Sequence, residues 1–447
     1  MLACEGAATA LCRHQFPGWQ VMCFIRIVLL GVSFRGAGRM LELISQVLGW
    51  EGRTPDWTTG RLWFLRWGLW QLQRAKERAG DWAWLVDHSV QIGRIKCLVV
   101  VGVRLRDLPA SGQCLRHRDL KLIALAPMES SNRQQVHDQL ELAAKITGAP
   151  RVIVDDHGAD LHGGVVLFQQ QHPGTLEVYD TKHKAACLLK GRLEKSEPFQ
   201  RFGTLVAQVR CSLQQTELAF LVPPGPKAKS RFMNLGPTLA WARKALGALR
   251  DPPAWLGESA RRRMQEKLGA LEEFEGAMAQ WGQWQQVVDV AVELVGRQGL
   301  QAGTEGALGE ALRGSLEGKP WEAGTGELCE QLVSFVGEQS GRAAPGERLP
   351  GSTEVLESLF GRYKELEKQQ NKSGFTSLLC GFGALVTATQ EAVGQMIQPI
   401  RQALETSRTR DVFRWCGEKL GTTLNSLRRR AFASPRTAQQ KTYEGAG

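Results

Sequence analysis

Apolar residues recur at helical spacing near the start of the chain and predict two helices there. In the first, the apolar face follows a capping serine at Ser33 and consists of Met40, Leu41, Ile44, Val47 and Leu48. A polar turn over 52–55 separates this helix from a second one over 56–66, which begins with an aspartate. The start of the chain is therefore expected to be helical.

The short connection between these helices permits a DNA-binding interpretation. Two helices joined by a short polar turn can form a helix-turn-helix, whose second helix lies in the major groove. The residues offered to DNA would be Thr58, Thr59, Arg61 and Arg66 of the second helix, with Arg35 and Arg39 of the first. A small helical bundle rich in tryptophan explains the same spacing, so the pattern alone leaves both interpretations open.

From residue 82 the pattern changes to short runs rich in Val, Ile and Leu, which predict strands. The expected strands are 82–93, 96–105, 120–128, 151–156 and 175–180, with helices over 130–148 and 161–170 and another helix after the last strand. This sequence of elements is the topology of the RNase H-like α/β fold. It predicts a mixed five-stranded sheet of order 3-2-1-4-5, in which the first strand lies beside the fourth.

Residues 205–345 favour helices, and no convincing strand interrupts them. Helical spacing extends over 239–249, 259–294 and 328–338, with breaks at Gly and Pro such as 251–253. An all-helical segment is therefore expected between the last strand and the helix that begins near residue 353.

The excess positive charge lies at the two ends of the chain. Residues 1–80 hold ten Lys and Arg against five Asp and Glu, and residues 401–447 hold ten against four, within a net charge of +11. A polyanion such as DNA would be bound mainly by these ends, because basic side chains that neutralise phosphates supply most sequence-independent affinity. The second end includes Arg428, Arg429 and Arg430. Solubility alone explains the charge equally well.

The composition indicates a soluble cytoplasmic protein. The apolar runs 97–103 and 378–386 fall short of the ~18 residues that a membrane span needs, and the start lacks the charge pattern of a signal peptide. The ten cysteines include no Cys-x-x-Cys pair and no paired histidines to complete a zinc site. Reduced, buried thiols are expected, without a structural metal or a disulfide framework.

Two aspartates fall on the two strands that the topology makes neighbours. Asp87 lies within the first strand and Asp156 at the end of the fourth. Burying acids beside apolar residues costs on the order of several kcal/mol unless the acids are paired or bind a cation. Two convergent carboxylates suit Mg²⁺, and two ions ~4 Å apart can assist phosphoryl transfer. Asp155 or Asp160 could replace Asp156 as the ligand, because an acid at a strand end is often only a helix cap.

Two short motifs resemble elements of DNA transposases. The segment 156–160, Asp-His-Gly-Ala-Asp, is similar to the Asp-x-Gly element at the second aspartate of many transposases. The segment 178–183 resembles the Asp-x-x-His element of Mutator-like and hAT-like enzymes, with Asp180 and His183 in its two places. These two residues either support the chemistry or form a hydrogen-bonded pair that holds the loop after the fifth strand.

A third motif supplies a candidate glutamate. The segment 352–360 is similar to the Asn-x-x-Glu block of bacterial Mutator-type transposases, with Glu354 in the place of the asparagine and Glu357 in the catalytic place. On its predicted helix Glu357 lies at the margin of the apolar face, where a side chain can lean into a cleft. A surface glutamate in an ion pair is the alternative, and the reserve candidates for the third acid are Glu194 and Glu197.

These motifs together resemble bacterial insertion-sequence DNA transposases of the Asp-Asp-Glu, RNase H-like type with a helical insertion. The resemblance implies a DNA-binding region over 1–80, a catalytic core over 81–204 and 346–400, a helical insertion over 205–345 and a basic tail over 401–447. It implies that Asp87, Asp156 and Glu357 bind two Mg²⁺ ions, for which Mn²⁺ can substitute. The activity would be cleavage at element ends and strand transfer.

The partners implied by this resemblance are double-stranded DNA and further copies of the chain, assembled on DNA at the bacterial nucleoid. Two other functions fit the same sequence. One is a catalytically silent DNA-binding regulator derived from a transposase, which would lack one of the acids. The other is an RNase H-like nuclease or resolvase, which would cleave DNA without joining the ends to a target.

Overall fold

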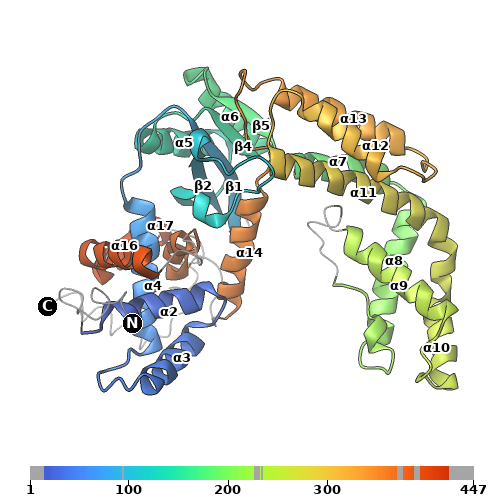
Figure 1. Ribbon diagram of the computed structural model, residues 1–447, viewed down its shortest axis with the longest axis horizontal. Coiled ribbons are helices and arrows are strands. Elements are labelled where there is room, and N and C mark those ends of the chain that lie inside the picture. The colour runs from blue at the N-terminus through green and yellow to red at the C-terminus, as the bar shows by residue number, and fades with distance from the viewer. Residues whose placement is uncertain are drawn as a thin grey trace. The chain divides into compact units, whose positions relative to one another are not determined.

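The computed structural model describes residues 15–92, 95–225, 232, 235–369, 376–386 and 393–421. The chain divides into two compact units, of which the first comprises residues 1–109, 115–177 and 353–447 (Figure 1). The second unit comprises residues 110–114 and 178–352. The first unit therefore assembles from three separate stretches of sequence.

A five-stranded sheet forms from the strands β1 (Trp82–Ile92), β2 (Ile95–Arg104), β3 (Lys121–Met128), β4 (Val152–Asp155) and β5 (Leu176–Tyr179). Its order is β3-β2-β1-β4-β5, which confirms the predicted order. β1 pairs with β2, and β2 with β3, in antiparallel fashion, whereas β1 and β4 are parallel. The central strand is thus the first in the sequence.

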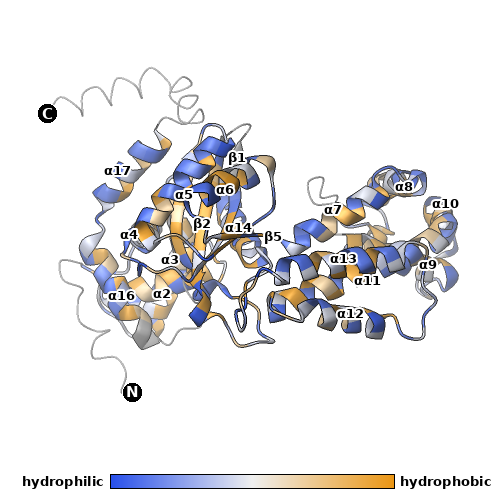
Figure 2. Ribbon diagram, turned by 90° about the horizontal axis from the view of Figure 1, so that it is seen from above, coloured by the Kyte–Doolittle hydropathy of each residue, from blue (hydrophilic) through white to orange (hydrophobic). Residues whose placement is uncertain are grey.

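One face of the sheet is covered by α5 (Arg133–Thr147) and α6 (Ala159–Gln171). Alternate residues of the strands face this layer, because successive side chains of a strand point to opposite sides. They form a core in which Trp84 and Phe168 are fully buried, with ring centroids 6.0 Å apart. The strands that α5 and α6 cover consist largely of apolar residues (Figure 2).

The other face of the sheet packs against α14 (Glu354–Lys368), which lies beside β1 (Figure 1). The apolar face of α14 is buried, and it consists of Val355, Leu356, Leu359, Phe360, Tyr363 and Leu366. Tyr363 is close enough to Cys97 of β2 for the thiol to contribute to the raised pKa of the phenol, which burial causes first. α14 therefore lies on the face that carries Cys97 and Val99.

The remaining elements of the first unit are helical. They are α2 (Gly18–Leu29), α3 (Phe34–Val47), α4 (Trp57–Gln73), α15 (Phe382–Leu385), α16 (Val393–Thr406), α17 (Thr409–Leu420) and the 3-10 turns η1 (Leu105–Asp107), η2 (His117–Asp119) and η6 (Ser377–Gly381). α4 is surrounded by the others, and every residue from Trp63 to Trp70 is buried. The predicted second helix is thus the centre of a helical bundle.

The second unit consists mainly of helices. These are α7 (Thr181–Leu193), α8 (Glu197–Leu213), α9 (Leu235–Arg250), α10 (Glu258–Leu268), α11 (Glu275–Gln298), α12 (Thr304–Ser315) and α13 (Thr325–Ser340), with 3-10 turns η3 (Ala219–Leu221) and η5 (Gly269–Phe274). The single helix expected over 259–294 is interrupted by η5. An isolated bridge pairs Leu300 with Leu349.

The cysteines that the structure describes are all free thiols. Cys97, Cys329 and Cys380 are buried as expected, but Cys114, Cys187 and Cys211 are exposed. The expectation of buried thiols was therefore wrong for these three, of which Cys114 lies in a loop, Cys187 in α7 and Cys211 in α8. Within the described part of the chain, no helix has the length and apolar character to cross a membrane.

The contact between α4 and η6 depends on glycine and generates the first prediction. A Cβ at Gly68 would overlap the carbonyl oxygen of Cys380 and the Cα of Gly381. We expect Gly68→Ala to lower the free energy of unfolding by about 1–3 kcal/mol, because the backbones must separate. Gly361→Ala, in open space on α14, should instead stabilise by about 0.5–1 kcal/mol. Thermal and urea unfolding of both variants would test this, and equal effects would contradict it.

Candidate active site

Asp87 lies within β1, and Asp156 immediately follows the neighbouring parallel strand β4. The paired residues of β1 and β4 end at Leu85 and Val154, and each aspartate comes two residues further along its chain. Parallel strands run in the same direction, so this register places both residues near the end of the sheet at which β4 terminates. Both side chains are half-buried.

The strand pairing also determines on which face of the sheet the side chain of Asp87 lies. It pairs with Val99 of β2, and it shares its face with Leu85, two residues earlier in β1. This is the face against which α14 packs. Asp87 is therefore the acid that the central strand presents to the α14 side of the sheet.

Asp156 begins the loop between β4 and α6. Its Oδ1 atom accepts a hydrogen bond of 2.8 Å from the backbone N–H of Gly158, immediately before α6 begins at Ala159. Between them His157 adopts a φ of +53°, a conformation that is uncommon for residues other than glycine. The loop thus turns sharply and leaves the carboxyl group of Asp156 partly open to solvent.

The adjacent Asp155 has a different environment. Its side chain is 0% exposed, and burial together with the neighbouring carboxylate of Glu177 raises the pKa of Asp155 to about 8. The Oδ1 atom of Asp155 accepts a hydrogen bond of 2.7 Å from the backbone N–H of His157. The side chain of Asp155 therefore points into the protein interior.

Asp160 is held by an ion pair. Its Oδ2 atom lies 2.8 Å from the Nζ atom of Lys96 and 3.9 Å from the Nε2 atom of His88. Burial alone would raise the pKa of Asp160, but hydrogen bonds from Lys96 and Ser131 and the nearby positive charge outweigh it and lower the pKa to about 2. Burial is also the main cause that lowers the pKa of His88 to about 4.

Glu357 lies in the first turn of α14, in the same unit as the two aspartates. Its side chain is half-buried, whereas that of Glu354, one turn earlier, is exposed. The next turn of α14 is anchored to η2, because His117 lies 3.2 Å from the hydroxyl of Ser358 and hydrogen-bonds Arg362. These contacts fix the helix that carries Glu357 against the sheet.

Asp180 and His183 form a helix cap in the second unit. The fully buried Asp180 accepts a hydrogen bond of 2.8 Å from the backbone N–H of His183, and its Oδ1 atom lies 3.4 Å from the Nδ1 atom of that imidazole. The pair therefore begins α7, which is the structural role left open above. Glu194 and Glu197 are exposed in the same unit, and Glu194 lies 3.8 Å from Lys190.

The expected DNA-binding residues divide into exposed and buried groups. Arg35, Arg39 and Thr58 are exposed, and Thr59 and Arg61 are half-buried, with Arg61 donating a hydrogen bond of 2.8 Å to Ser377. Arg66 is only 8% exposed and donates to the carbonyl oxygens of Leu404 and Ser407 at the end of α16. A side chain that caps a helix inside the bundle is not available to a DNA groove. Arg428, Arg429 and Arg430 lie outside the described residues.

A separate group of possible metal ligands lies at the same end of the sheet. His157, His162 and Glu177 are the group of three among the described residues whose ligand atoms all lie within 4.8 Å of one another. The trio of Asp87, Asp156 and Glu357 is not such a group. A buried glutamate between Leu176 and Val178 in a strand was the sequence signal for this cluster, and the sequence analysis did not single it out.

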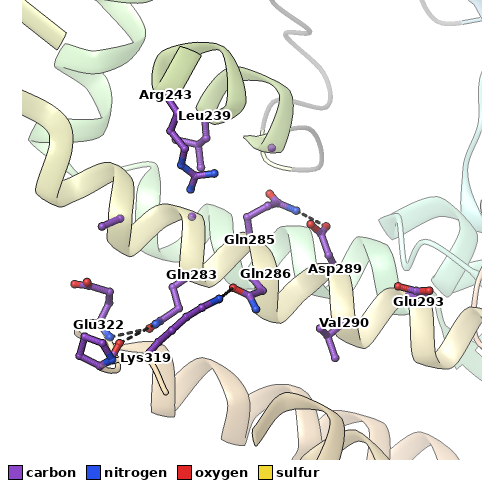
Figure 3. Close-up of a pocket in the computed structure, with 14 residues that line it drawn as sticks. Leu239, Arg243, Gln283, Gln285, Gln286, Asp289, Val290, Glu293, Lys319 and Glu322 are labelled. Atoms are coloured by element: carbon purple, nitrogen blue, oxygen red, sulfur yellow. Dashed lines mark hydrogen bonds between the residues drawn. The ribbon is translucent and has the colours of Figure 1, made fainter. Parts of the chain in front are cut away.

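A hollow of about 640 Å³ lies in the second unit between α9, α11 and the segment before α13 (Figure 3). Its charged residues are of both signs and comprise Arg243, Asp289, Glu293, Lys319 and Glu322. Several of its polar groups bind one another, such as Gln285 with Asp289 at 2.7 Å. The mixed charge favours no particular class of ligand.

Neither a family model nor a curated protein matches the chain. Among solved structures, the chain is similar to a chain of the Drosophila P element transposase strand transfer complex. The TM-score is 0.37 and the sequence identity 9%, over 89% of this chain and 94% of the other. A likeness at this level establishes neither a shared fold nor a shared activity.

The ion pair of Asp160 generates the second prediction. A carboxyl group whose pKa is lowered on folding stabilises the protein above its ordinary pKa, and this contribution is lost as the pH falls towards 2. We expect Asp160→Asn to cost about 1–2 kcal/mol at pH 7, because the pair with Lys96 is only partly exposed.

The measurement is the difference in melting temperature between wild type and Asp160→Asn from pH 7 to pH 2. The deficit of the variant should shrink between pH 4 and pH 2, because the wild-type carboxyl then becomes protonated. Asp107→Asn, at an exposed acid, is the control and should show little deficit at any pH. A deficit that does not change with pH would contradict the role of this charge.

Proposed function

We propose that this chain is a DNA transposase with an RNase H-like catalytic core, in which Asp87, Asp156 and Glu357 bind two Mg²⁺ ions. The observation that supports the proposal is the register of β1 and β4 in a sheet of order 3-2-1-4-5, in which each aspartate follows the last paired residues, Leu85 and Val154, by two positions. One of the motifs that resemble transposase elements, the segment 156–160, begins at Asp156. The second step, strand transfer, distinguishes this function from that of a nuclease.

The donor set suits Mg²⁺. Asp87 and Asp156 offer carboxylate oxygens, the ligands that this hard cation prefers, and both remain partly accessible. When bound, two ions would activate the attacking oxygen and stabilise the leaving oxygen of a phosphodiester. The chain's own contribution would be to hold one carboxylate within β1 and the other directly after the adjacent strand β4, so that little reorganisation is needed when DNA enters.

The surroundings of the neighbouring acids favour Asp156 over its two alternatives. Asp155 is fully buried beside Glu177, and its raised pKa disfavours the charged form that a metal ligand needs. Asp160 is charged, but Lys96 already neutralises it. Asp156 is the one of the three that combines partial exposure with a position directly beyond the end of the strand.

Glu357 is proposed as the third ligand because α14 packs on the sheet face that carries Asp87. The buried face of α14 fixes the helix, while Glu357 lies at the margin of that face. Since its carboxylate does not complete a compact trio with the aspartates, it would reach the ions through a side-chain rotation or a small shift of the first turn when DNA and Mg²⁺ bind.

The proposed DNA contacts use the outer surface of the N-terminal bundle and not α4. Arg35 and Arg39 lie one helical turn apart on α3, and both are exposed. The basic tail with Arg428, Arg429 and Arg430 would add further phosphate contacts. We propose that copies of the chain assemble on the DNA ends, because strand transfer joins two ends to one target.

The third prediction concerns the three acids. With duplexes taken from the DNA that flanks the gene, Asp87→Asn, Asp156→Asn and Glu357→Gln should each reduce Mg²⁺-dependent cleavage by about 10²- to 10³-fold. DNA binding and the melting temperature should change little. Glu354→Gln is the matched control on the same helix, because Glu354 is exposed, and it should cleave like wild type. Cleavage and joined products would be separated on denaturing gels.

The outcomes of this experiment separate the candidate functions. Cleavage without joined products would indicate a nuclease or resolvase on the same fold. Binding without cleavage by the wild-type chain would indicate a silent regulator. Full cleavage by Glu357→Gln alongside inactive aspartate variants would remove Glu357 from the proposed site.

The fourth prediction concerns α3. Replacing Arg35 and Arg39 together with alanine should weaken DNA binding and reduce the slope of log K against log salt by about 1.8, because two phosphate contacts are lost. The charge-matched control replaces Arg106 and Arg118, which are exposed elsewhere in the same unit. Fluorescence anisotropy at several salt concentrations measures both quantities. Equal slopes for the two double variants would place the DNA on another surface.

A further inference from the structure

The cluster of His157, His162 and Glu177 brings together three different elements of the first unit. His157 lies in the loop after β4, His162 in the first turns of α6 and Glu177 in β5. The Oε1 atom of Glu177 lies 2.8 Å from the Nδ1 atom of His162 and 3.5 Å from the Nε2 atom of His157. Three ligand atoms from three elements thus converge on one point.

These separations match those of a metal site. In a tetrahedral zinc site with bonds of ~2.0 Å, ligand atoms lie ~3.3 Å apart. The two measured distances lie on either side of this value, and all three atoms lie within 4.8 Å of one another. The two imidazole rings are stacked, with centroids 4.5 Å apart and planes inclined by 27°. Only small side-chain adjustments would close the group around one ion.

The burial of the carboxyl groups adds an electrostatic reason for a cation. Glu177 is 6% exposed and lies beside Asp155, which is 0% exposed. Two adjacent acids inside a protein are costly unless protons, hydrogen bonds or a cation compensate them. The two imidazoles supply neutral ligands on the same side, so a divalent ion would compensate the charge of the buried Glu177 without adding a further negative group.

The backbone conformation of His157 also supports a binding site in this cluster. Its φ of +53° is an uncommon conformation for a residue with a side chain, and such outliers gather at functional sites. This conformation places the ring over His162 and within reach of Glu177. The turn therefore directs the imidazole into the cluster.

We propose that His157, His162 and Glu177 form a zinc-binding site that fastens the loop between β4 and α6 to β5. Two imidazoles and one carboxylate are a donor set that Zn²⁺ uses and that Mg²⁺ does not prefer. The half-exposed His162 leaves the fourth position open to water. The site is distinct from the proposed catalytic carboxylates, and it does not rest on the proposed transposase activity.

The competing explanation is a metal-free ion pair between Glu177 and a protonated His162. Such a pair would hold the loop at low pH and would show no dependence on zinc. A metal site predicts the reverse, because zinc binding requires neutral imidazoles and stabilises the folded state by mass action. Metal affinity and metal-dependent stability therefore separate the two explanations.

The experiment uses the full chain, freed of any purification tag and stripped of metal. Because exposed thiols also bind zinc, Cys114, Cys187 and Cys211 are first replaced by serine in the reference protein. Zinc affinity is measured by competition with a chromophoric chelator, and the melting temperature is measured with and without Zn²⁺. We expect one tightly bound ion per chain and a higher melting temperature with zinc.

The variants test the assignment of the ligands. His162→Ala and Glu177→Gln should each weaken zinc binding by at least about 100-fold and abolish the rise in melting temperature. His172→Ala is the matched control, because His172 ends the same helix and lies 2.9 Å from Glu141 in a similar pair. It should bind zinc like the reference protein. Far-ultraviolet circular dichroism confirms that each variant is folded.

Two results would overturn the proposal. One is a reference protein that binds no zinc in the competition, and the other is unchanged affinity in both His162→Ala and Glu177→Gln. Asp87→Asn should bind zinc normally, so a failure of the catalytic assignment leaves this test intact. Normal DNA cleavage by a chain that binds no zinc would remove the zinc site and leave the proposed function in place.

Discussion

The parallel pairing of β1 with β4 is the constraint on which the site depends. It joins the first strand of the chain to one that follows α5, and in its register Asp87 and Asp156 each come two residues after the last paired residues. Pairing shifted by one residue would turn one of the two carboxylates to the opposite face, because side chains alternate along a strand. The apolar residues of β1 hold the register, since Trp84 and Val86 are buried under α5 and α6.

Four polar residues between the end of β4 and the first turn of α6 lie in four different environments. Asp155 points into the protein beside Glu177, Asp156 stays at the surface of the sheet edge, and Asp160 is neutralised by Lys96. His157 is turned by its positive φ toward Glu177. Neighbouring acids therefore acquire opposite pKa shifts, because burial and Glu177 raise the pKa of Asp155, whereas hydrogen bonds from Lys96 and Ser131 outweigh burial at Asp160.

The helical bundle around α4 shows how packing determines which side chains of a predicted helix are accessible. Helix-turn-helix and small bundle predicted the same helices, and the sequence around Trp63, Trp67 and Trp70 was compatible with both. In the structure these tryptophans are buried on several sides by α2, α3, α16 and η6, and Arg66 caps α16. Arg35 and Arg39 of α3, by contrast, are exposed to solvent.

The sequence by itself determined the strands, their order and the positions of Asp87 and Asp156, because periodicity and strand propensity are local properties. It also predicted most helices, though it merged α10 and α11 into one. Only the tertiary structure separated Asp155, Asp156 and Asp160 by burial and brought His157 and His162 to Glu177. These distinctions depend on which side chains from different elements come into contact. The spacing of residues along the chain does not determine those contacts.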